Sequence, residues 1–183
     1  MSATAGGRVF ISHTTASNAF AGAAIEACNE AGWVPVDMRW FSAADRTPTA
    51  NDRLKVEECD VFVAILGLDY GSPTRDRPDR SYCELEWDDA TTAGLTRLAY
   101  LRRGESTDDR QASFRQRVLD SDLTADWFET AEQLQHKLFK ALSELPVPER
   151  TDSTAAMNVR VERNEGVIAQ EISGPITFNR GSA

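Results

Sequence analysis

The sequence is poor in cysteine, histidine and long apolar runs, and each shortage excludes a class of protein. The 183 residues include three cysteines that lie far apart and two histidines, with no Cys-x-x-Cys pair, so we expect neither a disulfide framework nor a metal site. No stretch approaches the roughly 18 apolar residues of a membrane span, and no apolar run precedes the first strand-like segment, as a signal peptide would require. We therefore expect a cytoplasmic protein with no membrane span and no resident cofactor.

Positive charge is also scarce. Lys and Arg number 20 against 29 Asp and Glu, which leaves a formal net charge of −9. This excess repels nucleic acid, so no nucleic-acid partner is expected, and local geometry has to bind any phosphate-bearing ligand. Residues 157–183 contain three acids and three bases, so the negative charge lies on the residues before them.

The apolar pattern alternates between strands and helices. Strands are expected at 8–12, 33–37, 60–67, 97–101 and 126–128, and helices at 17–31 (with Ser17 as N-cap), 51–58, 81–93, 114–119 and 131–145. The run 60–67 is the most apolar and predicts a central strand, whereas Pro35 cannot donate to a ladder and predicts an edge strand. This order favours an α/β, flavodoxin-like fold with a parallel five-stranded sheet of order 2-1-3-4-5 and helices on both faces.

Composition changes near residue 146. Residues 146–156 contain two prolines and many small polar residues, which is typical of a linker. We therefore predict an α/β domain over 1–145, a linker over 146–156 and a β-prone tail over 157–183.

In a sheet of this order, ligands bind at the carboxyl ends of the first and third strands. Two groups of candidate ligand-binding residues lie there: Ser12, His13 and Thr14 after the first strand, and Gly67, Tyr70 and Gly71 after the third. The two glycines either let the backbone approach a ligand or only shape a loop. His13 either bonds a phosphate or ribose or has a structural role.

The helix expected at 81–93 begins with a Ser-x-x-Glu capping box, in which Ser81 accepts from the Glu84 N–H and Glu84 reaches back to Ser81. The cap leaves Glu86 unexplained. A carboxylate in this first part of the helix can receive ribose hydroxyls or stabilise a sugar cation as a glycosidic bond breaks, or it can simply interact with the helix dipole.

Three ordered motifs carry a family resemblance: VFISH at 9–13, DVFVAILGLDYG at 60–71 and SYCELEWDDA at 81–90. They resemble an uncharacterised bacterial TIR-like family that is often fused to STAND-type ATPases. More distantly, they resemble TIR domains and nucleoside deoxyribosyltransferases, which share a flavodoxin-like core. The resemblance to TIR enzymes implies that Glu86 supports cleavage of NAD at the nicotinamide–ribose bond, with Ser81 and Tyr82 beside the ligand. His13 departs from the serine that is usual in the TIR-like family.

The loop at 38–48 lies where TIR proteins carry a loop that mediates assembly and closes over the nucleotide. Trp40 and Phe41 in this loop either stack on an adenine or nicotinamide ring or cover the edge of the sheet.

The tail resembles the RHIM-like amyloid signalling motifs of bacterial immune proteins. Its high β-propensity and zero net charge would let identical chains stack in register. The candidate assembly residues are Val167, Ile168, Gln170, Ile172, Gly174 and Ile176. Glu171 and Pro175 depart from an ideal zipper, and the alternative is a β-hairpin packed on the domain.

These observations favour a TIR-like effector of bacterial immune or antiphage signalling that hydrolyses the N-glycosidic bond of NAD when clustered. The expected partners are a nucleotide, further copies of the chain, and a STAND- or NLR-like protein bound through the tail. The alternative is a non-catalytic adaptor or nucleotide-binding module that assembles through its tail. An enzyme similar to nucleoside deoxyribosyltransferases is less favoured, because their Asp-x-Gly-Thr segment is absent.

Overall fold

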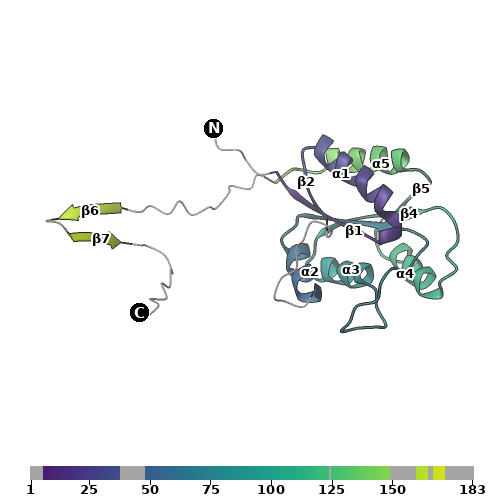
Figure 1. Ribbon diagram of the computed structural model, residues 1–183. Coiled ribbons are helices and arrows are strands. Elements are labelled where there is room, and N and C mark those ends of the chain that lie inside the picture. Colours follow the sequence, from purple (N-terminus) through teal and green to yellow (C-terminus); the bar gives the residue numbers. More distant parts are fainter. Residues whose placement is uncertain (1–5, 38–47, 124, 149–159, 165–166, 172–183) are drawn as a thin grey trace. The chain divides into compact units, whose positions relative to one another are not determined.

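The computed structural model describes residues 6–37, 48–123, 125–148, 160–164 and 167–171 (Figure 1). The chain divides into two compact units, Met1–Arg150 and Thr151–Ala183. The strands of the first unit are β1 (Arg8–His13), β2 (Val34–Asp37), β3 (Val61–Leu66), β4 (Thr96–Arg102) and β5 (Ala125–Phe128). Its helices are the 3₁₀ turn η1 (Thr15–Ser17), α1 (Asn18–Glu30), α2 (Pro48–Glu57), α3 (Tyr82–Thr92), α4 (Asp109–Leu119) and α5 (Ala131–Glu144).

The five strands of the first unit form one parallel sheet in the order β2-β1-β3-β4-β5, which confirms the predicted topology. Helices α1 and α5 cover one face, and α2, α3 and α4 cover the other (Figure 1). The strand that contains Pro35 lies at the edge, as expected for a residue that lacks an N–H donor.

Alternation along the buried strands divides the core into two halves. On β1, Phe10 packs with the α3 side, whereas Val9 and Ile11 pack with the α1 and α5 side. All six residues of β3 are buried, as expected for a central parallel strand covered on both faces. The stacked rings of Phe10 and Phe62, with centroids 5.6 Å apart, lie on the α3 side. Consecutive residues at the end of β1 therefore point into different halves of the molecule.

The start of α1 differs from the prediction. A 3₁₀ turn precedes the helix, and Ser17 occupies the N-cap position without a side-chain capping bond. Its hydroxyl instead lies 3.3 Å from the Thr14 hydroxyl, because the turn directs Ser17 back toward the end of β1. The predicted cap is therefore wrong in its bonding, although the position of the helix is right.

Helix α4 begins five residues before the predicted start at 114. Asp108 caps it by accepting from the Arg110 N–H at 2.9 Å. The first turn is polar, so a search for apolar residues found only the later part of the helix. Its early residues nevertheless include the buried Gln111, which lies near the carboxyl edge of the sheet.

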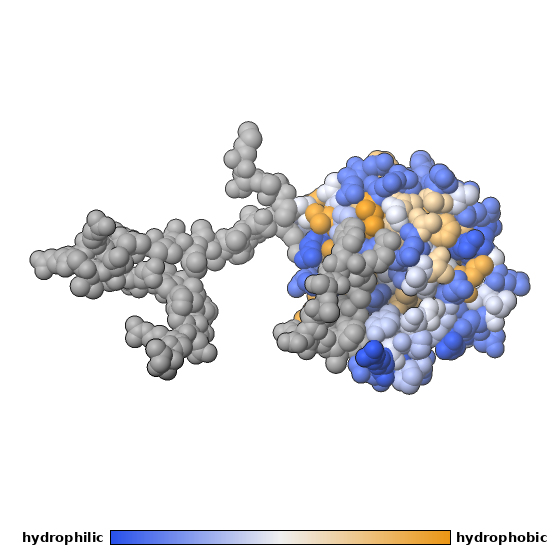
Figure 2. All heavy atoms as spheres, viewed as in Figure 1, coloured by the Kyte–Doolittle hydropathy of each residue, from blue (hydrophilic) through white to orange (hydrophobic). Residues whose placement is uncertain are grey.

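The surface of the first unit is mostly hydrophilic in the face that Figure 2 shows, with small hydrophobic areas between charged residues. Among the described residues, no helix combines the length and apolarity needed to cross a bilayer. The cysteines Cys28, Cys59 and Cys83 are buried as free thiols.

The described part of the second unit is an antiparallel hairpin of β6 (Arg160–Asn164) and β7 (Val167–Glu171). Three predicted assembly residues, Val167, Ile168 and Gln170, lie in β7. The other three, Ile172, Gly174 and Ile176, lie outside the described residues. The hairpin gives the tail the expected β-structure, while amyloid-type stacking stays a prediction.

Candidate functional site

The carboxylate of Glu86 meets the end of β1 on the α3 side of the sheet. Ser12 Oγ donates a hydrogen bond to Glu86 Oε2 at 2.6 Å, and both residues are buried. Glu86 lies on the inner face of α3 with Cys83 and Ala90, about one turn on either side. Because strand order reverses between β1 and β3, the carboxylate lies where ligands bind in open α/β sheets.

Cys83 belongs to the same buried cluster of polar side chains. Burial raises the pKa of its thiol to about 12, and the nearby Glu86 carboxylate adds to the rise, while a hydrogen bond with Ser12 opposes it. The thiol is therefore neutral at physiological pH and is not a nucleophile there. Cys83 contributes a compact, weakly polar wall beside the carboxylate.

The loop after β3 closes tightly on the residues after β1. Gly71 has φ +80°, and a Cβ on it would lie 2.9 Å from Thr14 Cγ2. A Cβ on Gly67 would lie 2.8 Å from Ser17 Oγ. Both glycines therefore let the loop pass close to neighbouring side chains at this edge. The approach of a ligand to this backbone stays a prediction.

On the other face of the sheet, His13 meets Asp37 at the end of β2. His13 Nε2 lies 3.4 Å from the Asp37 carboxylate, and Nδ1 lies 2.9 Å from the Thr14 carbonyl oxygen. The Asp37 side chain is completely buried and the His13 side chain is 5% exposed. His13 thus joins two strand ends. Its binding to a phosphate or ribose stays a prediction.

Asp37 is a buried polar residue at this edge that the sequence analysis did not single out. A signal existed, because Asp37 ends an apolar strand at the same carboxyl edge as Ser12. Sequence reasoning passed over it by following the motifs of the first and third strands only.

Tyr70 and Ser81 connect the loop after β3 with the start of α3. The Ser81 N–H donates to the Tyr70 hydroxyl at 3.2 Å, and that hydroxyl donates to the Glu84 carboxylate. Desolvation and the Glu84 carboxylate raise the pKa of Tyr70. Tyr82, next in the chain, is half-buried, and its N–H donates to the Ser72 carbonyl at 3.2 Å.

The predicted capping box forms only in part. Ser81 Oγ accepts from the Glu84 N–H at 3.3 Å, as expected, but the Tyr70 hydroxyl takes the Ser81 N–H that Glu84 was expected to bind. The Glu84 carboxylate instead bonds Tyr70 and Arg117 NH2, the latter at 2.9 Å. The predicted bond from the Ser81 N–H to Glu84 is therefore wrong, because Tyr70, from the loop after β3, accepts from that N–H instead.

Two side chains of helix α4 form hydrogen bonds to the loop after β3. Gln111 Nε2 donates to the Gly67 carbonyl at 2.8 Å, and Arg115 NH1 lies 3.4 Å from the same oxygen. Both side chains are buried. The predicted helix began too late to include Gln111, and Arg115 lay inside it but was not singled out. Polar residues at positions i and i+4 on the apolar face of a helix were the available signal.

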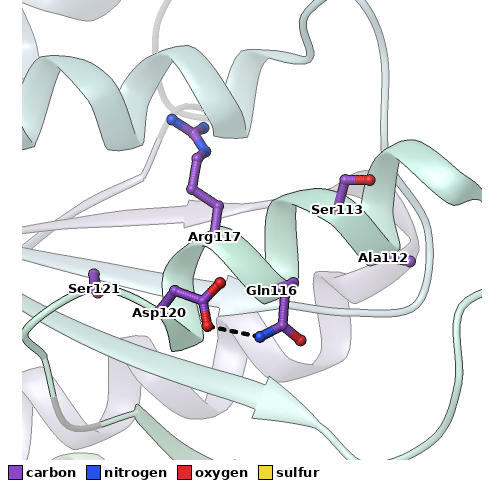
Figure 3. A pocket seen from close by; sticks show the side chains of 6 residues that line it. All are labelled: Ala112, Ser113, Gln116, Arg117, Asp120 and Ser121. Carbon is purple, nitrogen blue, oxygen red and sulfur yellow. Dashed lines mark hydrogen bonds between the residues drawn. The ribbon is translucent and has the colours of Figure 1, made fainter.

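Hollows also occur away from this edge. The one in Figure 3, about 790 Å³, is an open surface over the outer side of α4, where Gln116 Nε2 bonds Asp120 Oδ1 at 2.7 Å. None of the predicted site residues lines it. Its wide opening makes it a weaker candidate than the buried polar groups at the strand ends.

The structure thus brings Ser12 and Glu86 into direct contact, and Thr14, Gly67 and Gly71 close to the same edge. Trp40 and Phe41 lie outside the described residues. Among the residues that are described, no group of three or more His, Cys, Asp or Glu side chains could hold a metal ion.

The chain belongs to the family described as "Domain of unknown function (DUF4062)", which matches residues 8–146. The finer likeness to TIR proteins, to STAND fusions and to amyloid motifs stays a prediction. Comparison with curated proteins finds no match.

Solved structures with similar chains include an N-glycosidase and a flavodiiron core. The CMP N-glycosidase BcmB of Clostridium botulinum is 19% identical, with a TM-score of 0.48, and the match covers 73% of this chain and 98% of that one. The Flv1 flavodiiron core of Synechocystis is 12% identical, with a TM-score of 0.41, and the match covers 77% of this chain and 35% of that one. Similarity at this level says nothing about activity.

Proposed function

We propose that this DUF4062 domain hydrolyses the N-glycosidic bond of a nucleotide, with Glu86 as the catalytic carboxylate and NAD as the first substrate to test. The observation that carries the proposal is the 2.6 Å hydrogen bond between Ser12 and Glu86 at the edge where β1 and β3 diverge. It joins a carboxylate from α3 to a strand end at the ligand-binding position of this fold.

The chemistry requires a negative group beside a sugar that becomes positive. As the C1′–N bond breaks, its electron pair leaves with the base and positive charge develops over C1′ and the ring oxygen. A carboxylate held in a site with little water stabilises that charge more than water would. Water then bonds to C1′ and loses a proton to Glu86 or to solvent, which completes hydrolysis.

Burial of Glu86 defines how a substrate must bind. The residue is 4% exposed, so a ribose reaches the carboxylate only when neighbouring groups yield space. The Ser12 hydroxyl is the natural exchange partner, because a ribose hydroxyl can replace its hydrogen bond to Oε2. The close loops at 12–14 and 67–71 would hold the rest of the nucleotide, with Ser81 and Tyr82 beside it. We extend the proposal to Trp40 and Phe41 as aromatic contacts for a base.

The decisive experiment compares Glu86→Gln with Glu144→Gln, which changes the net charge equally on an exposed part of α5. Release of nicotinamide from NAD and of free base from nucleoside monophosphates is measured over a range of protein concentrations. We expect Glu86→Gln to reduce the rate about 100-fold or more, and Glu144→Gln to leave it unchanged. Equal rates in the wild type and Glu86→Gln would remove the proposal.

A second candidate function, assembly through the tail, is favoured by the β6–β7 hairpin. A two-stranded hairpin is marginally stable alone, and both of its outer edges can pair with further strands. The hairpin of one chain would then add to that of the next, and the first unit would act as an adaptor or as an enzyme activated by clustering.

Light scattering on the full chain tests this assembly. Val167→Asp in β7 is compared with Val147→Asp, the same change at an exposed valine of the first unit. We expect oligomers in the wild type and in Val147→Asp and their loss in Val167→Asp. Oligomers that persist in Val167→Asp would exclude the hairpin as the assembly element.

A further inference from the structure

Arg115 is a buried cation that donates hydrogen bonds to neutral carbonyl groups. Its side chain lies on α4, and the residue is 6% exposed. Arg115 NH2 donates to the Arg102 carbonyl at 2.7 Å, NH1 lies 3.4 Å from the Gly67 carbonyl, and the guanidinium lies 5.6 Å from the centre of the Trp127 ring. Burial lowers its pKa, and among the described residues no carboxylate opposes this shift.

A buried charge without an opposite charge is costly. Taking a cation out of water disfavours folding unless a counter-charge or several hydrogen bonds compensate. Carbonyl oxygens compensate in part, because they accept from the guanidinium without neutralising it. An anion beside Arg115 would supply the missing charge.

Arg115 also lines a hollow where an anion fits. The hollow has a volume of about 330 Å³ and is bounded by the loop after β4 and the side of α4. Its other lining residues are Gly104, Glu105, Ser106, Ala112, Gln116 and Leu119. Gly104 has φ +120°, a conformation that favours glycine, so the loop bends sharply at this point.

We propose that this hollow binds a phosphate group, with Arg115 as the cation that holds it. An arginine guanidinium matches a phosphate in charge and in the direction of its donors. The exposed Glu105 carboxylate also lines the hollow. It repels an anion and so lowers the affinity for phosphate. Ser106 Oγ donates to the Leu68 carbonyl at 2.6 Å and so fixes the loop rather than the ligand.

The hollow and the Glu86 edge share one loop. Arg115 approaches the Gly67 carbonyl and Ser106 bonds the Leu68 carbonyl, while the other side of the same loop contacts Thr14 and Ser17. If the proposed function holds, on which this last step rests, the phosphate belongs to the nucleotide substrate. If it does not, the same chemistry describes a site for free phosphate.

Calorimetric titration at low ionic strength tests the site with three probes: inorganic phosphate, adenosine monophosphate and adenosine. The variants are Glu105→Gln, which removes the opposing charge, and Glu144→Gln, which makes the same change far along the chain on α5. We expect Glu105→Gln to bind both phosphate-bearing probes about fivefold more tightly, and Glu144→Gln to match the wild type.

Arg115→Lys is the complementary variant, and its urea denaturation shows whether it folds. We expect it to weaken both phosphate-bearing probes about fivefold or more, because lysine lacks the paired donors of arginine. Tighter binding of adenosine monophosphate than of phosphate identifies a nucleotide as the source of the anion, whereas equal binding identifies free phosphate. The proposal is overturned if Glu105→Gln leaves the affinity for the phosphate-bearing probes unchanged, or if adenosine is the only probe that binds.

Glu86→Gln separates this inference from the proposed function. Glu86 contacts Ser12 on the α3 side and does not line the hollow. Glu86→Gln is therefore expected to keep the phosphate affinity of the wild type even where it abolishes cleavage. If the chain binds phosphate but has no glycosidic activity, the proposed function is wrong and the anion site is supported.

Discussion

Two buried carboxylates lie on opposite faces of the sheet at the end of β1. Ser12 points to the α3 side and bonds Glu86, whereas His13, the next residue, points to the α1 side and contacts Asp37. Both carboxylates are almost completely inaccessible. Alternation along one strand therefore produces two polar pairs on opposite faces, each with a buried carboxylate but with a different partner.

The difference between the pairs is in what holds each carboxylate. Asp37 belongs to the sheet itself and faces an imidazole, which can carry a positive charge. Glu86 belongs to a helix and accepts from a hydroxyl, which cannot. The first arrangement suits a structural contact between strand ends, and the second is the one on which the proposed function depends.

The largest expected effect is at Asp37. Asp37→Ala leaves His13 Nε2 without its hydrogen-bond partner in a buried site, and we expect the free energy of unfolding to fall by about 3 kcal/mol. Asp37→Asn keeps an acceptor oxygen and should lose clearly less. Urea denaturation of the two variants measures both values, and equal losses would mean that the contact with His13 contributes little.

Ser12→Ala tests the other pair. It removes a hydrogen bond to a buried carboxylate, and we expect a loss of about 1.5–3 kcal/mol in the free energy of unfolding. Ser143→Ala, at an exposed position on α5, is the matched control and should change stability by less than about 0.5 kcal/mol. A Ser12→Ala protein as stable as the control would show that the Glu86 carboxylate does not depend on Ser12.

The thiols on the two faces give a third contrast. Burial raises the pKa of Cys28, on the α1 side, and of Cys83, on the α3 side, each to about 12. Unfolded thiols lose their protons near pH 9, so above that pH the unfolded chain binds fewer protons than the folded one. Stability present at neutral pH is therefore lost as pH rises, with a limiting slope of about 1.4 kcal/mol per pH unit for each thiol.

Urea denaturation at pH 8, 9 and 10 measures that slope. Cys28→Ala and Cys83→Ala should each reduce the slope of the free energy of unfolding against pH by the contribution of one thiol. Glu86→Gln should lower the pKa of Cys83 and leave that of Cys28 unchanged, since only Cys83 lies beside this carboxylate. An equal change at both thiols would contradict the separation of the two faces.

The fold followed from the sequence because its strongest signals are local. The apolar run at 60–67 and the proline in the second strand predicted the centre and the edge of the sheet, and both positions are confirmed. The early start of α4 was missed because its first turn is polar and its stability depends on a cap at Asp108. Apolar periodicity does not detect such a turn.

The site could be predicted only where one motif pointed to it. Ser12 and Glu86 lie 74 positions apart. The expected topology placed Ser12 at the ligand-binding edge and the resemblance pointed to Glu86, but neither predicted the hydrogen bond between them. Arg115 and Asp37 were not identified, because their importance arises from burial beside groups distant in the chain. The partners of Glu84 were wrong for the same reason: Tyr70 and Arg117 come from other elements.

The smallest effect compares two glycines with nearly the same backbone. Gly71, in the loop on the Glu86 side, and Gly94, after α3, have φ of +80° and +69°. Alanine at Gly94 meets nothing within 4 Å and should cost only the conformational term, about 1 kcal/mol. Alanine at Gly71 meets Thr14 Cγ2 at 2.9 Å, so we expect about 1 kcal/mol more. Urea denaturation gives the difference, and Thr14→Ser, which removes the obstructing methyl group, should abolish it. If the difference persists with Thr14→Ser, the loop is constrained by something other than its contact with the residues after β1.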